Sequence, residues 1–504
     1  MVPKMEEVIE GPDLNAGRSR VDKKNYRQFL LHNGLRVVIV SDTLIMGQHD
    51  MGVINDGSDS ESDMSNESDQ DSDGDHSFGD EEDGIRKAAA AMVVRAGSFH
   101  DPLCCQGMAH FLEHMLFMGT KKYPSENEYS SFIEKHGGSD NAFTELEYTL
   151  YHFDIAQEKL FEGIDRFAQF FISPLLREDS KGRELNAIES EFKLSQNSDD
   201  CRLQQLMCHT GKAAEEHPFG KFSWGNLRSL KEIPEKNDVN LSSELKTFYD
   251  QFYYAQNMRL VVIGAYSLDE LQSQVVKKFS GVPALPREPS PLNIQLEDAV
   301  TWNETSHSPI EDFGMPLDPS LGKIYRIVPV KEKHNLTITW QLPPQRNWKS
   351  KPADYVAHLL GHEASGSLLS SLKARSWANA CYAGIDSGGH ENASSHALFS
   401  FNLVLSEEGV SHWVEIISLV YTYIGMVRYY CHSDKGLPSC IYDELKAVHE
   451  MAYAFADEMT PEELVEDIAE DAICSYLPPE RLLDGNSLLY EFDGDAIKVS
   501  FCSS

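Results

Sequence analysis

The hydrophobic pattern of the chain predicts both strands and helices. Short apolar runs bounded by Gly, Asn, Asp or Pro are typical of strands, whereas apolar residues three and four positions apart are typical of helices. The runs on either side of Asn33-Gly34 predict a hairpin, because Asn-Gly favours tight turns. The expected strands are residues 29–31, 35–40, 88–94, 140–144, 148–153, 258–264 and 336–342. The expected helices are residues 107–118, 125–136, 156–171, 180–194 and a segment that contains residues 361–363.

Two regions of this mixed kind are separated by residues 284–322, which are rich in Pro, Asp, Glu and Ser and predict a linker. We therefore expect an α+β protein with two domains of related topology, each a mixed, largely antiparallel sheet covered by helices. The expected domains are residues 25–283 and 323–495, with a flexible N-terminus at residues 1–24 and an atypical tail at residues 496–504.

Residues 56–83 differ in composition from the rest of the chain. They contain thirteen acidic residues, many Ser and Gly, and no Lys or Arg, so we expect a disordered insert in the first domain. Such an arm is either a solvated loop without a task or a segment that recruits basic peptides or partners. The whole chain of 504 residues carries a net charge of −36, which repels nucleic acid and anionic membranes, and we expect neither as a partner.

The cysteines and the lengths of the apolar runs bear on the cellular compartment of the protein. The nine cysteines are odd in number and have no regular spacing, and no run of about 20 apolar residues is present, which is the length a membrane-spanning helix needs. Residues 1–20 are polar and lack the apolar core of a secretory signal. We therefore predict a cytoplasmic protein with reduced cysteines.

One segment of the first region carries candidate chemistry. His110, Glu113 and His114 share one helix face, in the order H-x-x-E-H. Two imidazoles one turn apart are spaced to bind one metal ion, and the carboxylate can reach a water on that ion. A His on an apolar helix is more often structural, but burying three titratable groups without partners costs several kcal/mol. The apolar surroundings therefore favour a metal site; they are Met108, Phe111, Leu112, Met115 and Leu116.

A further metal ligand is less evident from the residues alone. A catalytic zinc usually takes three protein ligands and leaves one position for water. Glu184 and Glu191 lie seven residues apart, so they share a helix face with Ile188. Composition alone favours a solvated acidic face here, and the pattern does not decide between the two interpretations.

The second region repeats part of this layout. A strand is followed by a connection and by Gly361-His362-Glu363, which suggests a faint internal duplication. Gly366 stands four residues after His362, where a second metal-binding His would be needed. We therefore expect this His–Glu pair to be structural.

Three motifs resemble a known family. G-M-A-H-F-L-E-H-M-L-F-M-G-T, G-G-S-D-N-A-F-T and R-E-L-N-A-I-E-S-E occur in this order at residues 107–120, 137–144 and 183–191. Together they resemble the insulysin/pitrilysin family of zinc metallopeptidases, which are inverzincins, and the resemblance extends over residues 27–476. It implies the insulysin-like fold, one Zn²⁺ per chain and proteolytic activity.

The resemblance also implies roles for the motif residues. His110, His114 and Glu191 are the implied zinc ligands. Glu113 is the implied base, which takes a proton from a water that zinc has acidified. Glu184 is implied to support the metal site without binding the ion.

For substrate binding, the resemblance points to Asn141, Ala142 and Phe143. They match an edge strand to which the peptide substrate adds as an extra strand. Residues 380–384 match a second strand, where family members anchor the substrate N-terminus, but Tyr382-Ala383-Gly384 replaces a more glycine-rich run.

The acidic insert narrows the resemblance to the nardilysin branch, whose members cut peptides before Arg in dibasic sites. We therefore expect a zinc metalloendopeptidase for short, basic peptides. Insulysin-type members are considerably longer than this chain, and their second half helps to bind the substrate. The alternative is a half-enzyme that binds peptides or proteins with little turnover, with a complementary C-terminal half or a full-length relative as its partner.

Overall fold

The structure is a computed structural model that describes residues 8–42, 86–288, 309–432 and 437–502. The predicted acidic insert at residues 56–83 lies outside the described residues, and so do residues 289–308 of the expected linker at residues 284–322. In the described part of the chain, no helix combines the length and the apolar character needed to cross a membrane.

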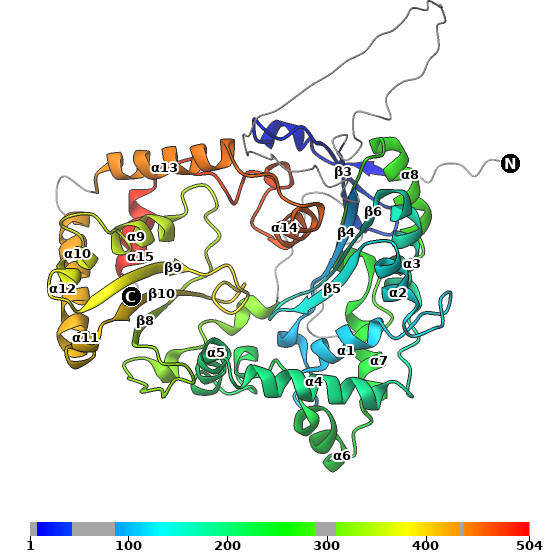
Figure 1. The fold of residues 1–504 in the computed structure, drawn as a ribbon, viewed down its shortest axis with the longest axis horizontal. Coiled ribbons are helices and arrows are strands. Elements are labelled where there is room, and N and C mark those ends of the chain that lie inside the picture. Colours follow the sequence, from blue (N-terminus) through cyan, green and yellow to red (C-terminus); the bar gives the residue numbers. More distant parts are fainter. Residues whose placement is uncertain (1–7, 43–85, 289–308, 433–436, 503–504) are drawn as a thin grey trace, which may run out of the picture.

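Two sheets organise the described chain (Figure 1). The first has seven strands in the order β1-β2-β3-β7-β4-β6-β5, and only β3 and β7 pair in parallel. The second has three antiparallel strands in the order β8-β10-β9. The strands of the first sheet are β1 Ile9–Glu10, β2 Asn25–Leu30, β3 Arg36–Ser41, β4 Lys87–Val94, β5 Ser139–Thr144, β6 Thr149–Ala156 and β7 Met258–Gly264. Those of the second are β8 Asn335–Leu342, β9 Ala378–Ile385 and β10 Ala397–Leu405.

Fifteen α-helices occur in the described residues. Those before the second sheet are α1 Met108–Leu116, α2 Glu128–Lys135, α3 Leu160–Ile172, α4 Lys181–Ser195, α5 Asp199–Thr210, α6 Ile233–Lys236, α7 Leu241–Phe252 and α8 Leu268–Phe279. The others are α9 Pro352–Leu360, α10 Leu368–Lys373, α11 Glu407–Ser411, α12 Trp413–Cys431, α13 Ser439–Ala454, α14 Pro461–Ile473 and α15 Gly494–Cys502. The predicted α+β class is confirmed, because antiparallel strand pairs predominate and helices cover the sheets.

The first sheet is buried on both faces, and the alternation of side chains along a strand assigns each face its own core. On β4, Ala88, Ala90 and Met92 pack with helices α1, α3, α7 and α8. Ala89 and Ala91 point the other way and pack with α14. This explains why β4 and β7 read as continuous apolar runs rather than as alternating patterns.

The packing of α14 corrects the expected domain arrangement. Sequence order placed residues 461–473 in the second domain, but Val465, Ile468 and Ala469 pack against the first sheet. In Figure 1, α14 lies beside β4, away from α9, α10 and α12. The C-terminal part of the chain therefore supplies the missing cover for one face of the first sheet.

The N-terminus also differs from the expectation. Residues 8–24 are attached to the first sheet, because Ile9 and Glu10 pair with Leu30 and Phe29 and Leu14 is buried. The tail forms α15, whose Ile497 is buried in the core of the second sheet. The expected helix over residues 361–363 is wrong, because α9 ends at Leu360.

Candidate metal centre

Helix α1 begins at a backbone position that only glycine fits. Gly107 has a φ of 92°, and a Cβ there would lie 2.2 Å from the Cα of Gly225. The buried carboxylate of Asp101 accepts hydrogen bonds from the amides of Gly107 and Ala109, at 2.6 and 2.8 Å. These bonds satisfy amides that have no partner inside the helix and fix the direction of α1.

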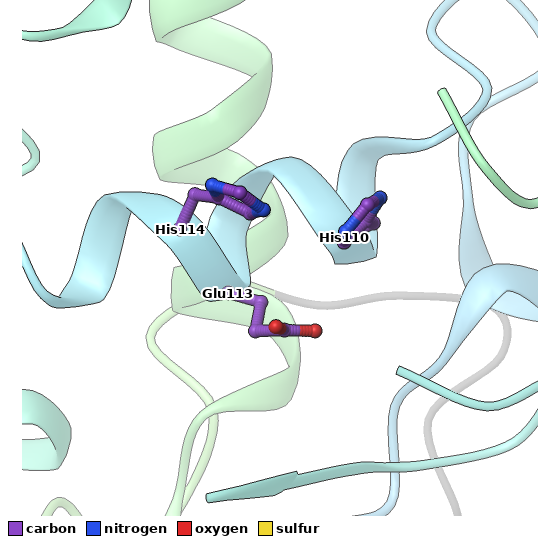
Figure 2. Close-up of side chains that lie close together, drawn as sticks. All are labelled: His110, Glu113 and His114. Carbon is purple, nitrogen blue, oxygen red and sulfur yellow. The ribbon is translucent and has the colours of Figure 1, made fainter. Parts of the chain in front are cut away.

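The apolar face of α1 fixes the direction of its histidines. Met108, Phe111 and Leu112 are fully buried in the helix-covered core of the first sheet. The rings of His110 and His114 lie one turn apart, with centroids separated by 5.0 Å. Figure 2 shows the rings of His110 and His114 on consecutive turns of α1, with Glu113 leaving the helix beside His114.

Each imidazole is oriented by an acceptor at its Nδ1 atom. His110 Nδ1 lies 2.6 Å from the carbonyl oxygen of Trp224, and His114 Nδ1 lies 3.3 Å from Oε2 of Glu184. An Nδ1–H that donates to these acceptors leaves Nε2 free as a ligand atom, which is the usual arrangement of metal-binding histidines.

Glu191 brings its carboxylate to both histidines. Its Oε2 atom lies 3.4 Å from Nε2 of His110 and 3.5 Å from Nε2 of His114. Helix α4 carries Glu184 and Glu191 on the face where Ile188 is buried against the core, so the packing of Ile188 aims both carboxylates at α1.

The pKa values of these groups reflect the contacts. Hydrogen bonds from His110 and His114 hold the pKa of Glu191 well below its usual range. Burial alone would lower the pKa of His114, but its contacts with Glu184 and Glu191 raise it to about 10. The site thus concentrates negative charge on two nitrogen ligands, which suits a cation.

Glu113 takes a different position from Glu191. The side chain is 8% exposed, and its Oε2 accepts a hydrogen bond of 2.6 Å from the hydroxyl of Thr144 on β5. Burial raises the pKa of Glu113 above its ordinary value. Ligand atoms of Glu113, His110 and His114 lie within 4.8 Å of one another, so the carboxylate borders the site.

The donor set fits a zinc ion. Zinc takes imidazole nitrogen and carboxylate oxygen, and donors about 2.0–2.1 Å from a tetrahedral ion lie roughly 3.3–3.4 Å apart. The two distances from Glu191 to the imidazoles match this spacing. Glu184 supplies the outer carboxylate that such a His ligand usually has. His110, His114 and Glu191 are therefore the residues that would hold the ion.

A cavity of about 690 Å³ opens beside the site. Asn141, Ala142 and Phe143 line it, and they belong to β5, the edge strand of the first sheet. The carboxylates in its wall are Glu113, Asp140, Glu145, Glu184 and Glu191, and no Lys or Arg is among the described residues that line it. Residues 380–384 form part of β9 but do not line this cavity.

Several residues of the site were not expected from the sequence. Trp224 and His390 line the cavity from distant segments, and Asp101 caps α1 from the preceding loop. A search for an acidic residue shortly before the motif helix would have found Asp101, because such residues cap helix N-termini. No local sequence pattern identifies Trp224, because it contributes a backbone carbonyl oxygen and not its side chain.

Comparison with known families and proteins identifies relatives of the chain. Residues 80–217 match the family described as insulinase (peptidase family M16), and residues 241–431 match the peptidase M16 inactive domain. The chain is 40% identical to a nardilysin-like protein of Arabidopsis thaliana, over 82% of this chain and 38% of that protein. It is 37% identical to human nardilysin, over 82% of this chain and 34% of that protein, and 36% identical to bovine insulin-degrading enzyme, over 96% and 40%. The chain spans only about a third to two fifths of the length of these relatives.

Two solved structures share the fold. Pitrilysin superposes with a TM-score of 0.78 at 24% identity, covering 98% of this chain and 45% of that one. A protease from Helicobacter pylori superposes with a TM-score of 0.61 at 17% identity and covers 95% of each chain. Both structures support the α+β architecture.

Proposed function

The chain belongs to peptidase family M16, and on that premise we propose that it is a zinc metalloendopeptidase that hydrolyses short, basic peptides. The named relatives, nardilysin and insulin-degrading enzyme, are metallopeptidases of this family. One observation carries the proposal: Oε2 of Glu191 lies within 3.5 Å of Nε2 of both His110 and His114, with Glu113 beside them.

The residues around the site have separate roles in the proposed reaction. A bound Zn²⁺ would acidify a water molecule and polarise the scissile carbonyl. Glu113 accepts the proton of the attacking water and delivers it to the leaving amine, and its raised pKa suits this exchange. Thr144 holds the Glu113 carboxylate in place, and Trp224 and Glu184 hold the two imidazoles.

The same cavity supports the proposed preference for basic peptides. Five carboxylates line it without a Lys or Arg among the described lining residues, so a cationic peptide would meet a favourable field. An extended peptide can add to the edge of β5, where Asn141, Ala142 and Phe143 lie. Main-chain pairing there would orient the substrate, and the carboxylates would select basic side chains.

The decisive experiment uses the Glu113→Gln variant and a quenched peptide that contains a dibasic site. We expect Glu113→Gln to retain zinc and to lose most turnover, because it removes the base but none of the three ligands. Glu363→Gln, on an exposed residue after α9, is the matched control and should keep both properties. Zinc content is measured by mass spectrometry on the purified protein.

Two other outcomes would change the conclusion. Zinc retention without turnover by the wild-type chain would favour a peptide-binding module, the alternative function. Equal turnover by wild type and Glu113→Gln would exclude Glu113 as the base. A matched peptide with neutral residues in place of the basic pair tests specificity, and equal cleavage of both peptides would reject the basic preference.

A further inference from the structure

A second group of possible ligands lies on the opposite face of the first sheet from α1. His152 on β6 faces Glu462 and Glu466, which are one turn apart on α14. Along β6, Tyr151 and Phe153 point into the core shared with α1, so the alternation of the strand sends His152 toward α14. Figure 1 shows α14 beside β4 and away from α1 and α3.

The imidazole of His152 is buried between two carboxylates. Its Nδ1 atom lies 3.0 Å from Oε1 of Glu462 and 2.9 Å from Oε1 of Glu466. The residue is 5% exposed, and within the described chain Nδ1 has no hydrogen bond of acceptable geometry despite these short distances. Neither oxygen therefore lies along the N–H direction of Nδ1.

Acidic side chains outnumber basic ones around this group. Six of the 13 residues of α14 are acidic and none is basic. Lys87 is close, but its ammonium pairs with Asp154 at 2.6 Å.

We propose that His152, Glu462 and Glu466 form a second metal site, which binds Zn²⁺ or a similar divalent transition-metal ion. One imidazole nitrogen and two carboxylate oxygens are a donor set that such ions accept, and all three ligand atoms lie within 4.8 Å of one another. An ion there neutralises the two carboxylates and occupies the free Nδ1. Because the ligands come from β6 and α14, the ion fastens the C-terminal helix to the first sheet.

The test counts zinc ions per full-length chain, with excess Mg²⁺ present to occupy other acidic surface. Wild type should bind two ions, and His110→Ala/His114→Ala should bind one. Glu462→Gln/Glu466→Gln should also bind one, and the chain with all four substitutions should bind none. Glu444→Gln/Glu450→Gln on α13 changes the charge equally at exposed positions and should still bind two.

A stability measurement tests the site without activity. In the His110→Ala/His114→Ala chain, Zn²⁺ should raise the melting temperature, and adding Glu462→Gln/Glu466→Gln should abolish that rise. The proposal is overturned if the His110→Ala/His114→Ala chain binds no ion and gains no stability from Zn²⁺. It is also overturned if the two Gln substitutions leave the zinc count unchanged. Neither result bears on the peptidase proposal, which concerns the other face of the sheet.

Discussion

Helix α1 and the end of α9 have histidines at the same spacing, but among the described residues only the pair on α1 belongs to a candidate metal centre. His110 and His114 on α1 correspond to His358 and His362, and the ring centroids of the pairs are 5.0 and 5.6 Å apart. The partner of His362 at this spacing is His358, four residues before it, because the residue four positions after it is Gly366.

The difference between the two helices lies in what surrounds the histidines. Gly361 occupies the position that corresponds to Glu113, and α9 ends one residue before it. His362 therefore lies beyond the helix, where its Nδ1 accepts a hydrogen bond from the amide of Ala364. On α1, Glu191 reaches both rings from α4. Histidine spacing alone does not make a metal site, because the carboxylates complete it.

The largest expected effect is the loss of a zinc ligand. His114→Ala should weaken zinc binding by more than about 100-fold, because even removal of an outer partner typically costs 10–100-fold. His362→Ala, the corresponding change after α9, should leave zinc affinity unchanged. Competition with a chelator of known affinity measures both, and equal losses would contradict the distinction between the two helices.

Removal of the outer carboxylate should have a smaller effect. Glu184→Gln keeps the shape of the side chain but weakens its contact with Nδ1 of His114, so zinc affinity should fall roughly 10–100-fold. Glu363→Gln, which removes an exposed carboxylate paired with Lys373 in the second region, is the control and should change nothing. An unaltered affinity in Glu184→Gln would show that this carboxylate does not act on the site.

Without metal, the pKa values of His114 and His358 should be shifted in opposite directions. His114 should titrate near pH 10, whereas burial lowers the pKa of His358. Protonation of His114 therefore stabilises the fold. This contribution is fully present below the unfolded pKa of about 6.5, and it is lost as the pH rises through about 10. His358 destabilises the fold as the pH falls below about 6.5. Imidazole NMR of the metal-free chain measures both, and a His114 pKa below 6.5 would refute the carboxylate contacts.

The smallest expected effect comes from completing the motif in α9. Gly361→Glu restores the H-x-x-E-H pattern at residues 358–362. We expect no additional zinc, because α9 ends at Leu360 and no equivalent of α4 presents a further carboxylate among the described residues. An increase of one ion per chain, relative to wild type, would show that the local motif is sufficient after all.

The local elements of the first region could be predicted from the sequence. The strands around Asn33-Gly34, the strand β4 and the helices α1 to α4 all correspond to expected segments. Their patterns repeat every two or every three to four residues, and these periods follow from the geometry of strands and helices themselves. The face shared by His110, Glu113 and His114 follows from the same geometry.

The tertiary structure determines which other elements these helices and strands contact. Residue spacing left it open whether Glu191 was a solvated acid, and only the packing of α4 brought its carboxylate to within 3.5 Å of both imidazoles. The return of α14 to the first sheet and its approach to His152 are likewise invisible in the sequence, because they join segments about 300 residues apart. Local periodicity fixes which side chains share a face, whereas contacts between distant segments depend on how whole faces are buried against one another.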